Sequence, residues 1–199
     1  MASLSVLGVS GNIARPSRTS ALVSAITAQV ATLSGATTHL IELVDVGPHL
    51  FPSFSADGLK AFARENLPQV GRSAIEAIEA ADALVVGSPV YKGSYSGSFK
   101  HLFDLVRPTA LVGKPVLLSA TGGTPLHGLV TEHQLRPLFG FFNTLTLPTT
   151  IFALEGDFQD YQVGTTELSA RIKRAAAEFC ELLHAKSGAR QREPALALA

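Results

Sequence analysis

Short apolar segments alternate along the chain with longer segments in which apolar residues recur every three or four positions. Continuous apolar runs are typical of strands that are buried on both faces, whereas the longer spacing is typical of amphipathic helices. The apolar runs predict five strands, at residues 4–9, 38–43, 83–87, 115–120 and 149–154.

Helical spacing follows each predicted strand. The first helix is expected over residues 22–33, with Ser17 or Ser20 as its N-cap. Further helices are expected at 59–80, with an interruption near Pro68, and at 98–103, 126–142 and 168–183. Nearly all-apolar strands that alternate with helices predict an α/β fold, a doubly wound sheet of five parallel strands with helices on both faces.

The length of 199 residues fits one domain, which we assign to residues 1–186. Segment 187–199 is rich in Gly, Arg, Pro and Ala, and we expect it to be a disordered tail. Hydrophobic residues make up 46% of the chain, enough for a large core. Charged residues make up 16%, against about 25% in an average soluble domain, so we expect another subunit to cover part of the surface.

Charge and cysteine content exclude several classes of protein. Sixteen basic residues balance sixteen acidic ones, so a nucleic-acid partner is not expected. Cys180 is the single cysteine, and no Cys/His spacing matches a metal site. No apolar run reaches the roughly 18 residues of a membrane span, and segment 1–11 lacks the basic start of a signal peptide. We expect a cytoplasmic protein without a membrane partner.

Three predicted loops carry unusual chemistry, and all of them follow strands. In a doubly wound sheet, ligands bind beyond the carboxyl ends of the strands, so these loops should face one site. Loop 10–20 has hydroxyl and amide side chains and two arginines before a helix N-terminus, a combination that suits a phosphate without a metal. It matches neither the Walker pattern nor G-x-G-x-x-G, and an ordinary capped turn is the alternative.

The second and third loops, 89–97 and 121–124, combine small residues with two tyrosines. Small residues let the backbone approach a flat heteroaromatic ring, where amide groups can hydrogen-bond its edge. The alternative for the second loop is a surface loop whose tyrosines pack over apolar neighbours.

Taken in order, segments 16–22, 89–97 and 120–124 resemble the flavodoxin-like NAD(P)H-dependent FMN reductases. The resemblance covers nearly the whole chain and is closest to the FMN reductases of two-component alkanesulfonate and methanesulfonate monooxygenase systems. It implies FMN as cofactor, NADH or NADPH as hydride donor, a homotetramer built as a dimer of dimers, and an FMN-dependent monooxygenase that receives the reduced flavin.

The resemblance also implies a set of site residues. Backbone and side chains of the first loop would hold the FMN phosphate: Ser10, Ser17, Thr19 and Ser20. The other two loops would flank the isoalloxazine: Pro89, Val90, Tyr91, Lys92, Gly93, Ser94, Thr121, Gly122 and Gly123. The family commonly has an arginine two residues after the serine that matches Ser10, but this chain has Asn12 there; Arg15 or Arg18 would substitute.

The predicted helix 126–142 loses its phase midway. Leu126 and Leu129 share one face, whereas Leu135 and Phe139 lie nearly opposite at about 100° per residue. A π-bulge would realign the faces, and Pro137 lies near the break. In the similar sulfonate-branch reductases a π insertion at this place carries tyrosine, which implies that His133 occupies the insertion here and packs at a tetramer interface. A proline-kinked helix with an exposed histidine is the alternative.

The sequence therefore favours an enzyme that passes a hydride from NADH or NADPH to FMN and supplies reduced flavin to a sulfonate-cleaving monooxygenase. No side-chain acid or base is required, because the cofactor carries the chemistry. A flavodoxin-type electron carrier is one alternative, although such carriers are generally acidic. An FMN-bound quinone or azo reductase on the same fold is the other.

Overall fold

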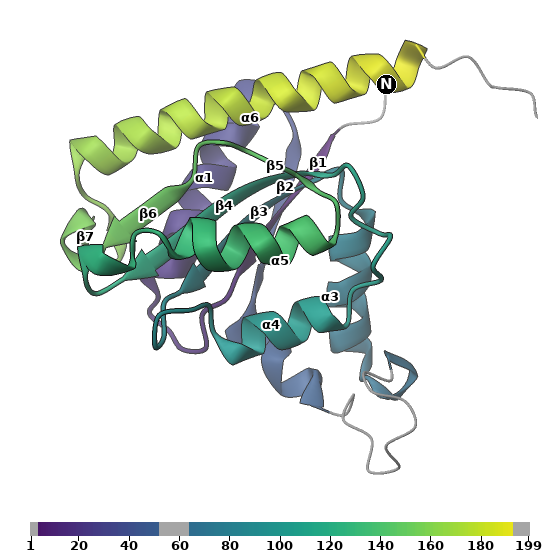
Figure 1. Ribbon diagram of the computed structural model, residues 1–199, viewed down its shortest axis with the longest axis horizontal. Helices are drawn as coiled ribbons and strands as arrows, with labels where there is room; N and C mark the ends of the chain where they lie inside the picture. The colour runs from purple at the N-terminus through teal and green to yellow at the C-terminus, as the bar shows by residue number, and fades with distance from the viewer. Residues whose placement is uncertain (1–3, 52–63, 193–199) are drawn as a thin grey trace, which may run out of the picture.

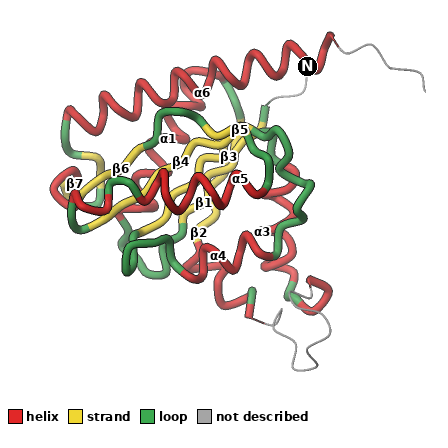
Figure 2. The backbone as a smooth tube through the Cα atoms, in the orientation of Figure 1, coloured by secondary structure: helices red, strands yellow, loops and turns green. Residues whose placement is uncertain are grey.

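The computed structural model of the protein describes residues 4–51 and 64–192, with residues 187–192 described by their backbone alone. A parallel sheet forms the central layer, and Figure 2 shows its strands between the helices. Its main strands are β1 (Ser5–Ser10), β2 (Thr37–Glu42), β3 (Ala83–Pro89) and β4 (Pro115–Gly122), in the spatial order β2-β1-β3-β4. The prediction of a doubly wound α/β fold is confirmed.

The fifth position of the sheet is shared by two short strands, β5 (Leu145–Thr146) and β6 (Ile151–Leu154), which pair with different parts of β4. The sequence predicts a single strand there, at 149–154. Pro148 lies between the two strands and has no N–H to donate to a neighbouring strand, which accounts for the break.

Helices cover both faces of the sheet (Figure 1). One face carries α1 (Arg18–Ser34) and α6 (Thr166–Arg192), and the other carries α2 (Leu43–Val46), α3 (Gln69–Ala80), α4 (Gly97–Asp104) and α5 (Arg136–Phe141). Each face has its own cluster of fully buried side chains. Ile26 and Phe179 belong to the α1–α6 cluster, and Phe99, Phe103 and Phe139 to the other.

Several helices differ in extent from the sequence prediction: α1 begins at Arg18, and the predicted helix 126–142 is divided into a 3-10 turn (Pro125–His127), a π-helix (Thr131–Leu135) and α5. The interruption near Pro68 is present, since a 3-10 turn (Arg64–Asn66) precedes it and α3 begins directly after it. The predicted residues 59–63 of this helix lie outside the described residues. At the other end, α6 continues to Arg192, so the expected boundary of the domain at 186 falls within a helix. The rest of the expected tail, 193–199, lies outside the described residues.

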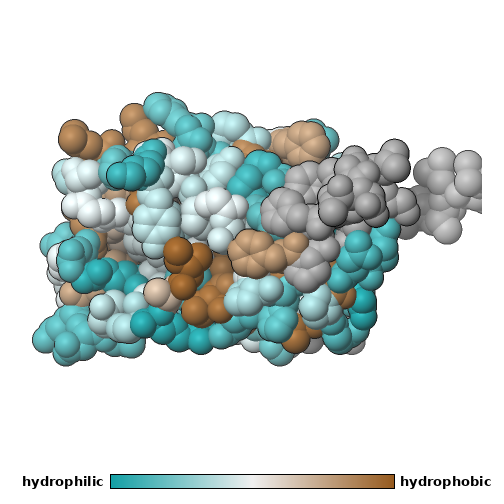
Figure 3. Space-filling view, turned by 90° about the horizontal axis from the view of Figure 1, so that it is seen from below, coloured by the Kyte–Doolittle hydropathy of each residue, from teal (hydrophilic) through white to brown (hydrophobic). Residues whose placement is uncertain are grey.

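Among the described residues, no helix is both long enough and apolar enough to cross a bilayer. Within the same ranges, no three His, Cys, Asp or Glu side chains are placed to hold a metal ion. The surface nevertheless carries apolar groups: the face seen from below shows a hydrophobic patch among hydrophilic residues (Figure 3). Large apolar side chains with more than half of their area exposed include Leu126, Leu129 and Phe141.

Candidate functional site

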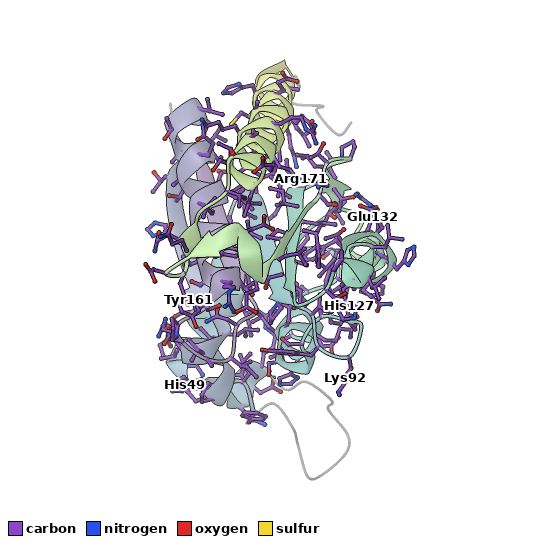
Figure 4. The ribbon with its side chains drawn as sticks, turned by 90° about the vertical axis from the view of Figure 1, so that its left-hand side faces the viewer. His49, Lys92, His127, Glu132, Tyr161 and Arg171 are labelled. Carbon is purple, nitrogen blue, oxygen red and sulfur yellow. The ribbon has the colours of Figure 1, made fainter. Side chains whose placement is uncertain are left out.

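The three predicted loops meet at the carboxyl end of the sheet and line one cavity of about 270 Å³. Its walls come from the loop after β1, the end of β3, the end of β4 and the turn after β6. The lining residues are Asn12, Ile13, Ala14, Pro16, Ser17, Arg18, Thr19, Pro89, Val90, Tyr91, Thr121, Gly122, Gly123, Glu155 and Tyr161. Figure 4 faces this end of the molecule, with Tyr161 on one side and His127 and Lys92 on the other.

The first loop is fixed by a backbone hydrogen bond near its start and by a side-chain cap at its end. Gly11 N–H donates to the carbonyl of Gly87 at 2.7 Å. Ser17 is the N-cap of α1, and its Oγ accepts from the N–H of Ser20 at 3.2 Å. The first N–H groups of α1, at Arg18 and Thr19, have no partner within the helix and lie beside the cavity. The helix start is therefore an arrangement that favours an anion.

Arg15 points away from the cavity. Its guanidinium donates to both carboxylate oxygens of Asp45, at 2.8 and 2.6 Å, and to Glu42 at 2.5 Å. The bonds from Arg15 lower the pKa of Asp45. Burial raises the pKa of Glu42, but hydrogen bonds from Arg15, Ser20 and Asn12 more than offset it, and the net pKa is lowered. The hydrogen bonds of the Arg15 guanidinium are therefore made to Asp45 and Glu42.

Arg18 lines the cavity. Its guanidinium hydrogen-bonds the carboxylate of Glu155 and lies over the ring of Tyr161, 5.2 Å from the ring centroid. Both partners come from the segment that follows β6, far from Arg18 in the sequence. Of the two arginines that the sequence left open, Arg18 is the one at the cavity wall.

A buried hydroxyl pair joins the first loop to the third. Thr19 Oγ1 and Thr121 Oγ1 lie 2.6 Å apart, and both side chains are buried. Val90 N–H donates in turn to the carbonyl of Thr121 at 2.8 Å, so the second loop is tied to the same residue. Thr121 therefore sets the relative positions of all three loops.

The second loop reverses direction in a tight turn at Tyr91–Ser94. The two residues exchange backbone hydrogen bonds of 2.9 and 3.1 Å, and the turn places Lys92 and Gly93 at positive φ, 52° and 79°. Lys92 is exposed and points outward (Figure 4). Ser94 Oγ donates to Gln134 Oε1 at 3.1 Å, a bond that connects this loop to the helix beyond the third loop.

The third loop needs its first glycine for packing. A Cβ at Gly122 would lie 2.7 Å from Cζ of Phe152, so a larger residue would displace that ring. At Gly123 an added Cβ would meet nothing within 4 Å, and the backbone faces open space. A flat ligand can approach the chain closely there.

Three buried polar atoms have no hydrogen-bond partner in the part of the chain that is described: Ser10 Oγ, Asn12 Oδ1 and His127 Nδ1. Buried polar atoms normally have partners, because leaving them unpaired costs free energy. Of these residues, Asn12 lines the cavity, Ser10 is the last residue of β1, and His127 lies beside Gly122 of the third loop. The oxygen of Asn12 is therefore available to a donor on a bound ligand.

A π-helix spans Thr131–Leu135 and includes His133, the residue at which the sequence predicts a π-bulge. The N–H of Arg136 bonds to the carbonyl of Thr131, and α5 begins at Arg136. Leu135 is fully buried whereas Leu126 and Leu129 are exposed, so the π-helix is present but does not bring these residues onto one buried face as the sequence predicts. His133 itself is exposed.

The π-helix is anchored to the segment between β5 and β6. Arg136 Nε donates to Glu132 at 2.5 Å, and Arg136 Nη1 donates to the carbonyl of Leu147 at 2.9 Å. The bonds from Arg136 lower the pKa of Glu132. Glu132 also accepts from Thr150, whose hydroxyl lies 3.0 Å from that of Thr131. These contacts fix the position of the π-helix, and Gln134 of that helix accepts the hydrogen bond from Ser94 of the second loop.

The structure brings nine of the predicted site residues to the cavity wall: Ser17, Arg18, Thr19, Pro89, Val90, Tyr91, Thr121, Gly122 and Gly123. Six predicted residues are not part of that wall: Ser10, Arg15, Ser20, Lys92, Gly93 and Ser94. Ser10 is fully buried directly behind the first loop, and Ser20 lies within α1.

Sequence reasoning missed Glu155 and Tyr161. Glu155 directly follows a predicted strand, and that position at the carboxyl end of the sheet was an available signal. Tyr161 lies in the turn between β7 (Phe158–Gln159) and β8 (Gln162–Val163), an antiparallel hairpin that no periodic pattern in the sequence announces.

Comparison with known proteins points to one enzyme family. The model of that family, NADPH-dependent FMN reductase, matches residues 4–159. The chain is 47% identical over 179 residues to the NADH-dependent FMN reductase SfnF of Pseudomonas fluorescens, covering 90% of this chain and 91% of that protein. It is 43% identical to an FMN reductase (NADPH) of Pseudomonas aeruginosa, covering 92% of this chain and 94% of that protein.

Solved structures agree with these sequence matches. An oxidoreductase from Corynebacterium diphtheriae, 29% identical, superposes with a TM-score of 0.79 and covers 92% of this chain and 98% of its own. The apo form of the NADH:FMN oxidoreductase EMOB, 26% identical, superposes with a TM-score of 0.76 and covers 90% of this chain and 89% of its own.

Proposed function

The chain belongs to the NADPH-dependent FMN reductase family and is an NAD(P)H-dependent FMN reductase, and from this premise we propose that the cavity holds FMN and that reduced flavin leaves it for a monooxygenase. The observation that carries the proposal is the meeting of three loops at one cavity, with Arg18 and the start of α1 on one side and Gly122 and Gly123 on the other.

The residues at the cavity fit FMN. Its phosphate requires hydrogen-bond donors and positive charge, and the wall offers the Ser17 and Thr19 hydroxyls, the guanidinium of Arg18 and the first N–H groups of α1. The buried hydroxyl of Ser10, unpaired within the described residues, is a further donor at the start of the same loop. Arg15 has no part in this proposal, since two carboxylates already occupy it.

The flavin ring fits beside the other two loops. Residues Pro89–Tyr91 and Thr121–Gly123 present backbone groups to the cavity, and Gly123 has open space where a side chain would begin. When bound, FMN supplies the chemistry by accepting a hydride from the nicotinamide. The chain contributes orientation: the Thr19–Thr121 pair and the Val90–Thr121 bond keep the phosphate loop and the ring loops at a fixed separation.

We propose a sulfonate-cleaving monooxygenase as the recipient of the reduced flavin, because the three loops resemble those of reductases in two-component sulfonate systems. An electron carrier of flavodoxin type would fit a strongly charged surface better than this chain, whose net charge is zero. Cys180, free and buried, is consistent with the proposed cytoplasmic location.

The test of this function is to measure oxidation of NADH or NADPH with free FMN, with free FMN and a sulfonate monooxygenase, and with a quinone. We expect oxidation of NADH or NADPH to require added FMN, and a sulfonate monooxygenase supplied with the reductase and free FMN to release sulfite. Turnover with a quinone that needs no free FMN, together with a flavin that stays bound through gel filtration, would instead indicate a quinone reductase.

We also propose a homotetramer. Leu126, Leu129 and Phe141 are 89%, 61% and 68% exposed, and His133 is exposed on the π-helix between them. Exposed apolar side chains so close in sequence favour a subunit contact. Sedimentation at micromolar concentration should give a tetramer, and a monomer that persists with FMN would contradict the proposal.

A further inference from the structure

Glu155 stands at the mouth of the cavity on a stiff turn. Strand β6 ends at Leu154, which pairs with Gly122 at the end of β4, and a 3-10 turn (Glu155–Asp157) follows at once. The side chain of Asp157 fixes this turn by accepting from the N–H of Leu154 at 2.7 Å and from the hydroxyl of Thr165 at 3.1 Å. The backbone of Glu155 is thus held next to the third loop.

The side chain of Glu155 is bonded to the one arginine of the cavity wall. Arg18 and Glu155 line the same cavity and form an ion pair, with side chains that are 36% and 71% exposed. The carboxylate lies mostly in water and can leave the arginine at little cost in solvation. Ion pairs this exposed are weak, so a second anion can compete for the guanidinium.

Tyr161 holds the guanidinium from its other side. Its ring lies 5.2 Å from Arg18 Cζ and comes from a turn in which both Asp160 and Tyr161 have positive φ, 47° and 58°. Such values are unfavourable for residues with a side chain, so the surrounding hairpin must maintain them. Stacking on this ring leaves the edge of the guanidinium available to whichever anion binds it.

We propose that Glu155 competes with the FMN phosphate for Arg18 and thereby keeps the affinity for FMN low enough for the flavin to be exchanged. The inference rests on the proposed function, in which the phosphate lies at Arg18, Ser17 and Thr19. A carboxylate and a phosphate are both acceptors for a guanidinium and both are negative, so a phosphate at Arg18 competes with Glu155 for N–H donors and is repelled by its charge. An enzyme that delivers reduced flavin to another protein must release it, and a competitor for the phosphate site favours release.

The experiment compares Glu155→Gln with the parent protein by flavin fluorescence titration. Glutamine keeps the shape of the side chain and removes its charge. We expect the Kd for FMN to fall about fivefold and the Kd for riboflavin, which has no phosphate, to stay within twofold. Glu155→Ala should act in the same direction. Glu181→Gln, which removes a charge from an exposed position of α6 away from the cavity, is the matched control and should change neither Kd.

The variants Arg18→Ala and Arg18→Ala/Glu155→Gln test the proposed phosphate site and the proposed competition separately. Without Arg18, removal of the Glu155 charge should change the Kd for FMN less than threefold, because there is no guanidinium left for the carboxylate and the phosphate to compete for. If Arg18→Ala weakens FMN and riboflavin equally, the phosphate does not lie at Arg18 and the proposed site fails together with the inference. If Arg18→Ala weakens FMN alone and Glu155→Gln leaves its Kd within twofold of the parent, the inference alone is overturned.

Discussion

The first loop carries two arginines, Arg15 and Arg18, that have the same charge and different surroundings. Arg15, the outer arginine, forms three hydrogen bonds with Glu42 and Asp45, which extend from β2 and α2. Arg18, the inner arginine, shares the cavity with Glu155 and Tyr161, which follow β6. The outer arginine faces two acids on neighbouring elements of the fold, and the inner one faces a single acid across a cavity.

This difference shows how an anion site can be built next to a structural ion cluster. The charge of Arg15 is taken up by two carboxylates, Glu42 and Asp45. Arg18 has a single acidic partner, Glu155, which is mostly exposed. Arg15 is therefore assigned to stability, and in the proposed function Arg18 binds the phosphate.

Removal of the inner arginine should have the largest effect. A hydrogen bond to a charged group contributes about 1.5–3 kcal/mol, so Arg18→Ala should raise the Kd for FMN roughly tenfold to a hundredfold. The Kd for riboflavin should remain within about twofold. Fluorescence titration of both flavins checks this, and equal losses for the two would contradict the assignment of Arg18 to the phosphate.

Removal of the hydrogen bond between Thr19 and Thr121 should have the next largest effect. Thr19→Val leaves the buried hydroxyl of Thr121 without its partner 2.6 Å away, which should lower the free energy of unfolding by about 1–3 kcal/mol. It should also weaken riboflavin, because the ring loops lose their link to α1, and should weaken FMN more, because its phosphate also loses the Thr19 hydroxyl. Thr32→Val on the exposed side of α1 is the control. Urea unfolding measures the difference, and equal stability of the two variants would contradict the role of this pair.

Removal of the outer arginine should have the smallest effect on flavin. Arg15→Ala should leave the Kd for FMN within about twofold of the parent and should lower stability in a pH-dependent way. The pKa values of Glu42 and Asp45 are lowered in the fold from their ordinary 4.5 and 3.8. Their contribution is therefore present above those values and is lost as pH falls through the lower, folded values.

Thermal unfolding from pH 7 to pH 3 measures this contribution. The gap in Tm between the parent and Arg15→Ala should be widest above about pH 5 and should close as the two carboxylates become protonated. A gap that is constant with pH would show that Arg15 acts through packing instead of charge.

Much of this architecture can be predicted from the sequence because burial leaves a periodic trace. Strands β1 and β3 contain continuous apolar runs, and the phase change between Leu129 and Leu135 indicates the π-helix. The contacts of the two arginines leave no such trace. Arg18 pairs with Glu155, which is far from it in the sequence, and only the three-dimensional fold brings these residues together.

The hairpin that carries Tyr161 is the clearest omission. Its two strands are two residues long each, and its turn residues, Asp160 and Tyr161, have no glycine to mark positive φ. The hairpin is stabilised instead by Asp157, whose carbonyl accepts from the N–H of Gly164 at 2.8 Å. Short strands fixed by one turn residue fall below what hydrophobic periodicity can indicate.

A crystal structure of the protein with FMN tests the central claim most directly. The account predicts the phosphate within hydrogen-bond distance of Ser17, Thr19 and the guanidinium of Arg18, with the ring beside Gly122 and Gly123. Arg15 should remain on Glu42 and Asp45. A phosphate bound to Arg15, or a flavin bound outside this cavity, would contradict it.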